Sequence, residues 1–284
     1  MLRRLQTYAS FVRISHSVFA LPFAMTGALL ASRLAPFVGM RLVWIAGCMV
    51  AARSSAMGFN RLVDASFDAR NPRTAMRELP QGAMSRGEAA VFVAVWSLAF
   101  IVMAAQLGRV CLLLSPVALG IVFWYSLAKR YTTYTQLFLG LAMAVAPVGG
   151  WIAMNGPVRV EPWLLGLAIG AWVGGFDVLY ACQDVEFDRR EGLRSIPVRF
   201  GVATALRISR AMHVMAVVAL AGVGYVAGLG PIYMAGVAIV GVLLAYEQSL
   251  VRPDDLSQVK RAFDLNGWVG LLYLAATALD VYFV

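Results

Sequence analysis

The chain has 284 residues, of which 61% are hydrophobic and only 14% are charged, and its formal net charge is +9. Soluble domains contain about 25% charged residues, so this composition excludes an ordinary soluble protein and indicates a polytopic membrane protein. The basic residues fall in short connections between apolar stretches, a pattern that argues against nucleic-acid binding and favours contact with anionic lipid headgroups.

Nine apolar stretches are long enough to cross roughly 30 Å of hydrocarbon as helices. We therefore predict an all-α fold, a polytopic membrane helix bundle of nine transmembrane helices around a central cavity, formed by a single domain over residues 1–284. The predicted spans cover residues 15–33, 41–62, 87–107, 109–127, 134–154, 161–183, 203–228, 231–251 and 263–283.

The distribution of Lys and Arg predicts how these spans are oriented. If the N-terminus is cytoplasmic, most of the 24 Lys and Arg residues lie in cytoplasmic connections, as the positive-inside rule requires. We therefore expect a multi-pass protein of the cytoplasmic (inner) membrane with its C-terminus outside. A cleaved signal peptide is the alternative interpretation of the first apolar stretch, but it conflicts with this charge distribution.

The second predicted span ends in a polar face. Asn60, Asp64 and Asp68 recur every four residues, so on an α-helix they drift over only about 80° of the surface. An ionised Asp at the centre of a bilayer costs roughly 2.5 to 3.5 kcal/mol. A face of this kind therefore requires cations.

The sixth predicted span ends in a second polar face. Asp177, Asp184 and Asp188 fall within about 40° of one another on an α-helix, so we predict that they form one face of one helix. The two longest non-apolar stretches, residues 68–86 and 184–202, follow the two faces and are rich in Arg. Both stretches are predicted to be cytoplasmic. We expect the two acidic faces to meet across the cavity at that side of the membrane.

Carboxylate and amide oxygens without His or Cys partners suit Mg²⁺ better than zinc or copper. Because Mg²⁺ usually takes one or two carboxylates from a protein and completes its shell with water and phosphates, two facing clusters predict a diphosphate between them. Arg73, Arg77 and Arg194 would donate to its oxygens. The alternative is an internal salt-bridge network, whose cations would be Arg53, Arg61, Arg189 and Arg190.

Both faces resemble motifs of the UbiA superfamily of intramembrane prenyltransferases. The stretch from Asn60 to Asp68 matches N-x-x-x-D-x-x-x-D, and that from Asp177 to Asp188 matches D-x-x-Y-x-x-x-D-x-x-x-D. The flanking stretches YSLAKRYT at 125–132 and GLRSIPVRFG at 192–201 agree, and the likeness covers essentially the whole chain. The resemblance implies that the two motifs hold Mg²⁺ and the diphosphate of a polyprenyl donor, over a cavity open sideways to lipid.

With this resemblance, each residue receives a hypothetical role. Asp177 would act catalytically near the acceptor, by orienting or deprotonating its hydroxyl group, and Tyr180 would stabilise the allylic cation or bind the diphosphate. Arg53 would bind the carboxylate of an aromatic acceptor, unless it pairs with Asp177. The metal ligands would be Asn60, Asp64, Asp68, Asp184 and Asp188. The diphosphate would be held by Arg73, Arg77, Lys129, Arg130 and Arg194.

The substrates implied are a polyprenyl diphosphate and an aromatic carboxylate of menaquinone or ubiquinone biosynthesis. The chain departs from the 4-hydroxybenzoate branch of the family, because Arg61 stands where that branch has Asp and Glu78 stands where Pro is usual. These features are more similar to the branch that makes menaquinone through futalosine. We therefore expect a dihydroxynaphthoate acceptor in preference to 4-hydroxybenzoate.

Two other functions fit part of the pattern. A prenyl-diphosphate cyclase or hydrolase on the same scaffold would need no aromatic acceptor. An ion-coupled secondary transporter would also place acidic residues inside the membrane. A transporter more often has single acids near the bilayer centre on broken helices, whereas here six polar residues gather at one membrane face.

Overall fold

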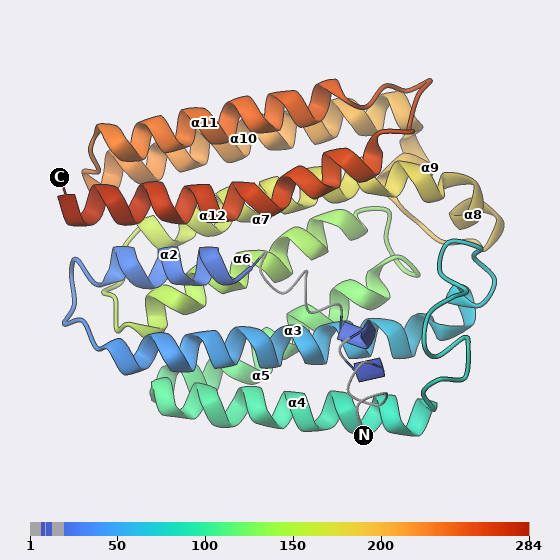
Figure 1. The fold of residues 1–284 in the computed structure, drawn as a ribbon, viewed down its shortest axis with the longest axis horizontal. Helices are drawn as coiled ribbons and strands as arrows, with labels where there is room; N and C mark the ends of the chain where they lie inside the picture. Colours follow the sequence, from blue (N-terminus) through green and yellow to red (C-terminus); the bar gives the residue numbers. More distant parts are fainter. Residues whose placement is uncertain (1–6, 9, 13–19, 284) are drawn as a thin grey trace.

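The computed structural model describes residues 7, 8, 10–12 and 20–283. Within these residues the fold is helical, and the extended pairing is limited to an isolated bridge between Arg252 and Asp255. The elements, in chain order (Figure 1), are α2 (Leu21–Ala31), α3 (Gly39–Asp68), α4 (Arg86–Leu107), α5 (Arg109–Ala128), α6 (Thr135–Ala153), α7 (Glu161–Ala181), a 3₁₀ turn (Cys182–Asp184), α8 (Val185–Arg190), α9 (Ile196–Phe200), α10 (Val202–Ala227), α11 (Pro231–Ser249) and α12 (Val259–Phe283).

The predicted all-α membrane bundle is confirmed. Eight helices of the described part are long and apolar enough to cross a membrane, and they correspond to the second through the ninth predicted spans. The first predicted span, residues 15–33, is represented by the 11 residues of α2. Because residues 13–19 lie outside the described part, the count of nine full-length spans is approximate.

The prediction of one continuous helix from Asp177 through Asp188 is wrong. Helix α7 ends at Ala181, and the 3₁₀ turn separates it from the short helix α8. A 3₁₀ turn has 3.0 residues per turn instead of 3.6, so it shifts the helical register. Asp177, Asp184 and Asp188 therefore belong to three successive elements and do not share one straight helical face.

Small residues allow α6 to lie against both α2 and α7. A Cβ atom on Gly150 would overlap the backbone oxygen of Ala24 in α2, and one on Gly140 would overlap the backbone oxygen of Gly170 in α7. Such close backbone approach is typical of packed membrane helices. Helix α6, which continues through Pro147, thus connects the N-terminal helix to the buried helix α7.

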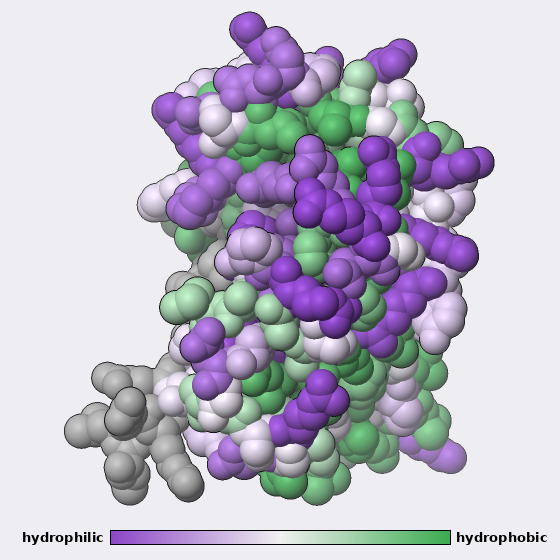
Figure 2. Space-filling view, turned by 90° about the vertical axis from the view of Figure 1, so that its right-hand side faces the viewer, coloured by the Kyte–Doolittle hydropathy of each residue, from purple (hydrophilic) through white to green (hydrophobic). Residues whose placement is uncertain are grey.

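The Arg-rich connections lie together at one end of the bundle. The loop of residues 69–85, α8 and α9 are all found on the right of Figure 1, opposite the connection between α2 and α3. Figure 2 shows this end, where hydrophilic side chains gather over the ends of the helices. The loop stops at Ser85, whose side chain accepts a hydrogen bond from the backbone of Glu88 and starts α4 as a capping box.

The consecutive glycines of α6 provide a matched test of this packing. We expect Gly150→Ala to lower the free energy of unfolding by about 1 to 3 kcal/mol, because the new methyl group meets backbone that cannot move aside. Gly149→Ala should be neutral or slightly stabilising, since the space beside Gly149 is open and Ala favours helix. Thermal unfolding in detergent would check this, and equal stability of the two variants would contradict the packing.

Candidate active site

The first acidic motif is buried where α3 ends. Asp64 is 3% exposed, and its carboxylate accepts hydrogen bonds from Lys129 Nζ at 2.6 Å and Arg130 Nη2 at 3.1 Å. Lys129 and Arg130 directly follow the last residue of α5. Asn60, one turn earlier on α3, donates to the same carboxylate at 3.4 Å. Two cations from a separate helix therefore neutralise Asp64.

Asp68, the last residue of α3, is paired with the loop that follows it. Both of its carboxylate oxygens accept from Arg77 Nη1, at 2.8 and 2.7 Å. The hydroxyl group of Thr74 donates to the backbone oxygen of Asp68 at 3.1 Å. These bonds fold the loop of residues 69–85 back over the end of α3.

Arg73 of the same loop reaches the second acidic motif. Its guanidinium donates to both carboxylate oxygens of Asp184, with the Nε bond at 3.1 Å, and to the hydroxyl oxygen of Tyr180 at 2.8 Å. The guanidinium carbon also lies 5.2 Å from the centre of the Tyr180 ring. This loop therefore brings the two motifs together, although they are more than 100 residues apart in sequence.

The carboxylates of Asp177 and Asp188 make no hydrogen bond or ion pair with any residue that the structure describes. Asp188 lies within electrostatic range of Asp184 and Asp64, and also of Lys129 and Arg73. The acidic end thus has two carboxylates without a direct counterion among the described residues. Cations are the natural ligands for such a group of like charges.

The oxygen donors of this group suit a hard divalent cation. Among the described residues, no three His, Cys, Asp or Glu side chains are arranged as a complete metal cage. Mg²⁺ does not need one, because it takes one or two carboxylates and obtains its other ligands from water and phosphate. The donor set therefore fits Mg²⁺ held between the protein and a phosphate group.

The connection after α8 lies beside Lys129, one of the basic residues that pair with the acidic motifs. The backbone N–H of Arg194 donates to the backbone oxygen of Lys129 at 2.7 Å, and the Arg194 side chain donates to the backbone oxygen of Tyr131 at 2.7 Å. Arg194 is therefore next to Lys129 but bonded to a carbonyl group. Arg73, Arg77, Lys129 and Arg130, in contrast, all contact the predicted metal ligands.

The salt-bridge network expected as the alternative has different members. Arg61 pairs with Glu78, and Arg190 pairs with Glu186. Neither Glu78 nor Glu186 is one of the Asp residues that define the two motifs. The cations at the motifs come instead from the loop of residues 69–85 and from the end of α5.

An exposed ion pair joins the two Arg-rich connections. Arg70 donates to one carboxylate oxygen of Glu191 from Nε at 3.0 Å and from Nη2 at 2.7 Å. The hydrogen bond from Arg70 lowers the pKa of Glu191. A carboxyl group with a lowered folded-state pKa stabilises the fold above its unfolded pKa and loses that effect as the pH falls through the folded value. The pair is thus lost only in acid, and its exposure makes it a weak contributor.

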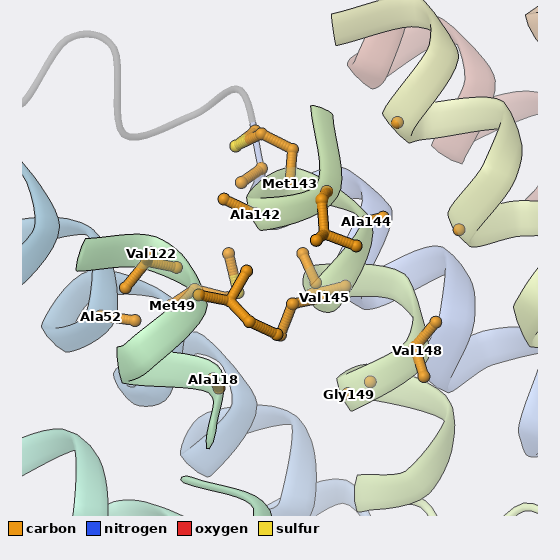
Figure 3. Close-up of a pocket in the computed structure, with 18 of the residues that line it drawn as sticks. Met49, Ala52, Ala118, Val122, Ala142, Met143, Ala144, Val145, Val148 and Gly149 are labelled. Atoms are coloured by element: carbon orange, nitrogen blue, oxygen red, sulfur yellow. The ribbon is translucent and has the colours of Figure 1, made fainter. Parts of the chain in front are cut away.

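An apolar cavity of about 720 Å³ lies inside the bundle. Its walls come mainly from α3, α5, α6 and α7, and Figure 3 shows side chains such as Met49, Val122 and Val145 around the common space. Leu137 and Leu141 also line it and are 45% and 49% exposed. The cavity therefore reaches the flank of the bundle.

Among the described residues, Arg53 is the one charged residue in the wall of this cavity. Its Nε is buried and has no hydrogen-bond partner among the described residues, and the alternative pairing with Asp177 is not seen there. The neighbouring wall residue Tyr125 lies within electrostatic range of Arg53, Asp177 and Asp64. The sequence analysis did not identify Tyr125, although its position one helical turn before Lys129 places the two on neighbouring parts of one face.

Comparison with known proteins agrees with this site. A family model described as the UbiA prenyltransferase family matches residues 20–273. The chain belongs to the UbiA prenyltransferase family. It is therefore an integral membrane prenyltransferase, as the resemblance of its two motifs implied.

Two curated members of the UbiA family have similar sequences. The chain is 31% identical to the 4-hydroxybenzoate octaprenyltransferase of Alkalilimnicola ehrlichii, over 97% of this chain and 94% of that protein. It is 32% identical to the 4-hydroxybenzoate octaprenyltransferase of Salmonella paratyphi C, over 86% of this chain and 85% of that protein.

Solved UbiA structures have the same fold. The apo structure of a UbiA homolog from Aeropyrum pernix K1 is 36% identical and superposes with a TM-score of 0.87, covering 94% of this chain and 98% of that one. A UbiA homolog from Archaeoglobus fulgidus, bound to GPP and Mg²⁺, is 20% identical with a TM-score of 0.74, covering 97% and 99%. At 20% identity, the similarity to the Archaeoglobus fulgidus homolog is evidence for a shared fold only.

Arg53, whose Nε has no hydrogen-bond partner among the described residues, generates a stability prediction. We expect Arg53→Met to leave the free energy of unfolding unchanged or to raise it, because a buried charge without a partner disfavours the folded state and Met fills a similar space. Thermal unfolding in detergent without substrates would measure the effect. A clearly lower melting temperature would show that Arg53 stabilises the fold through contacts not seen here.

Proposed function

We propose that this UbiA-family protein transfers a polyprenyl group from a polyprenyl diphosphate to an aromatic carboxylate, with Mg²⁺ bound at the two Asp motifs. The observation that carries the proposal is the combination of two neighbouring features: the cluster of acidic and basic residues at one end of the bundle, and an apolar cavity whose wall contains Arg53 and Tyr125. Tyr125 connects them, because it lies within electrostatic range of both Asp64 and Asp177. The names of the curated relatives, which are 4-hydroxybenzoate octaprenyltransferases, support it.

The polar end would hold the diphosphate. Mg²⁺, held by Asp64, Asp68, Asp184 and Asp188 with Asn60 beside them, would supply positive charge to the leaving group. The basic side chains that now pair with the carboxylates would turn to the phosphate oxygens, where guanidinium groups form charge-assisted hydrogen bonds. This set is Arg73, Arg77, Lys129 and Arg130, with Arg194 next to them.

The bond between the allylic carbon and the diphosphate oxygen breaks, and its electron pair leaves with the diphosphate. Donors already in place around the phosphate stabilise this charge as it develops. The remaining allylic cation would lie near the ring of Tyr180, whose electron-rich face attracts positive charge. The apolar cavity excludes water, which would otherwise capture the cation, and it accommodates the isoprenoid chain.

The acceptor would enter the cavity with its carboxylate on Arg53. A ring carbon of the acceptor then forms the new bond to the allylic carbon, and the hydrogen of that carbon leaves as a proton, which restores the aromatic ring. Asp177 would orient the acceptor's hydroxyl group or accept its proton while the ring attacks. The relatives' names favour 4-hydroxybenzoate, whereas Arg61 and Glu78 favour a dihydroxynaphthoate, as argued from the sequence. Both acceptors place a carboxylate and a hydroxyl group on an aromatic ring, as the site requires.

We further propose that residues 1–284 form one domain in the inner membrane, with the polar end of the site on the cytoplasmic side. The support is the position of Arg-rich connections at that end (Figure 2), combined with the preference of Lys and Arg for cytoplasmic connections.

The reaction can be tested with purified protein in liposomes. We expect radiolabelled farnesyl diphosphate and Mg²⁺ to give an EDTA-sensitive prenylated product with 4-hydroxybenzoate or with a dihydroxynaphthoate, each offered separately. Analysis of the organic extract identifies the acceptor. Diphosphate release without a prenylated acceptor would indicate a cyclase or hydrolase, and no consumption by folded protein would refute the proposal.

Removal of a metal ligand should abolish most of the activity. We expect Asp64→Ala and Asp184→Ala each to reduce kcat/KM about 100-fold to 1000-fold, equivalent to about 3 to 4 kcal/mol of transition-state stabilisation. Asp264→Ala is the control, because Asp264 is exposed and pairs with Lys260 on the surface. Wild-type turnover in either motif variant would contradict the metal assignment.

A further inference from the structure

The loop of residues 69–85 has a second attachment, in addition to its contacts with the acidic motifs. The carboxylate of Glu78 accepts a hydrogen bond from Arg61 Nη1 of α3 at 3.3 Å through one oxygen. Its other oxygen accepts from the hydroxyl group of Ser10 at 2.6 Å. Glu78 therefore joins three segments that are distant in sequence: the N-terminal segment, α3 and the loop.

This attachment is largely buried. The side chains of Arg61 and Glu78 are 5% and 13% exposed. By comparison, the Arg70–Glu191 pair at the other end of the loop has side chains that are 51% and 22% exposed. Loss of one partner from a buried ion pair leaves the other charge without compensation, whereas an exposed pair contributes little. The Glu78 attachment is therefore the stronger constraint on the loop.

Arg61 lies on the side of α3 that also carries Asp64 and Asp68. At about 100° per residue, its side chain leaves the helix about 60° from that of Asp64 and about 20° from that of Asp68. Its guanidinium donates to Glu78, which belongs to the loop and is not one of the predicted metal ligands. Arg61 therefore ties the loop to α3 next to the first acidic motif.

The attachment of Glu78 also limits where Arg77 can lie in the site. Glu78 directly follows Arg77, whose guanidinium contacts Asp68. The backbone N–H groups of Ala83 and Met84 donate to the backbone oxygen of Glu78 at 2.9 and 3.3 Å. The loop backbone around Glu78 is therefore compact, and movement of Glu78 would displace Arg77 with it.

We propose that Glu78, held by Arg61 and Ser10, is a positioning residue that keeps the loop of residues 69–85 closed over the site, so that Arg73 and Arg77 reach the diphosphate. The proposal rests on the proposed function for its substrate. During binding, the two arginines exchange carboxylate partners for phosphate oxygens, and the loop backbone stays fixed because Glu78 does not take part in the exchange. Glu78 touches no substrate.

The kinetic test compares two carboxylates that contact the same loop. Glu78→Gln should raise the KM for farnesyl diphosphate about 10-fold while kcat changes less than about 2-fold, because a loosened loop weakens binding of the diphosphate and leaves the chemistry in place. The matched control Glu191→Gln removes the exposed carboxylate and should change KM less than about 2-fold. Equal KM values in the two variants would overturn the proposal.

Limited trypsin cleavage tests the loop without the reaction. In nanodiscs without substrate, Glu78→Gln should be cut after Arg70, Arg73 or Arg77 several-fold faster than the wild type, while Glu191→Gln is cut at nearly the wild-type rate. Unchanged cleavage would overturn the proposal. If the wild type consumes no prenyl diphosphate, the proposed function fails, and the cleavage rates still decide whether Glu78 holds the loop.

Charge reversal separates positioning from a general loss of folding. Arg61→Glu alone should open the loop, and the double variant Arg61→Glu with Glu78→Arg should recover slow cleavage and a low KM, because the ion pair is restored in the opposite sense. Thermal unfolding in detergent shows whether each variant is folded. Failure of the folded double variant to recover either property would overturn the proposal.

Discussion

The burial of carboxylates at one end of an apolar bundle is the constraint on which the rest of this structure depends. Asp64 and Asp68 are almost fully buried, and a buried charge is tolerated only when it is paired. Their partners come from the end of α5 and from the loop after α3. Neutralisation of these charges therefore fixes how the connections dock, and the packed connections in turn close the polar end.

The same charges explain why the site suits diphosphate chemistry. Without substrate, the basic groups serve as counterions to the carboxylates, and with a metal-bound diphosphate they become donors to phosphate oxygens. The Asp188 carboxylate has no hydrogen-bond or ion-pair partner among the described residues and lies within electrostatic range of two other carboxylates and of Lys129 and Arg73, so it is available to bind an additional cation. The apolar cavity in the bundle would keep water from the reacting carbon. Polar and apolar requirements are thus met by neighbouring parts of one helix bundle.

The sequence predictions are confirmed where they depend on residues close together in the chain. Span positions depend on local apolar length, and eight spans agree with the helices that the structure describes. The spacing of Asn60, Asp64 and Asp68 holds because α3 is one uninterrupted helix. The regular α-helical register predicted after Asp177 is not kept, because the chain leaves the apolar segment near Cys182 and forms a 3₁₀ turn there. Tyr125 is missed because its importance comes from its neighbours in space.

The sequence by itself determined the class of the protein, the placement of its spans and the two motifs that relate it to its family, because these depend on composition and on residues close together in the chain. Only the tertiary structure decided which cation pairs with which carboxylate, since Lys129 and Asp64 are separated by 65 positions and Arg73 and Asp184 by 111. It also decided that Arg61, on the same side of α3 as Asp64 and Asp68, pairs with Glu78. Such pairings are set by how the helices pack, and no local pattern encodes the distance between side chains on different helices.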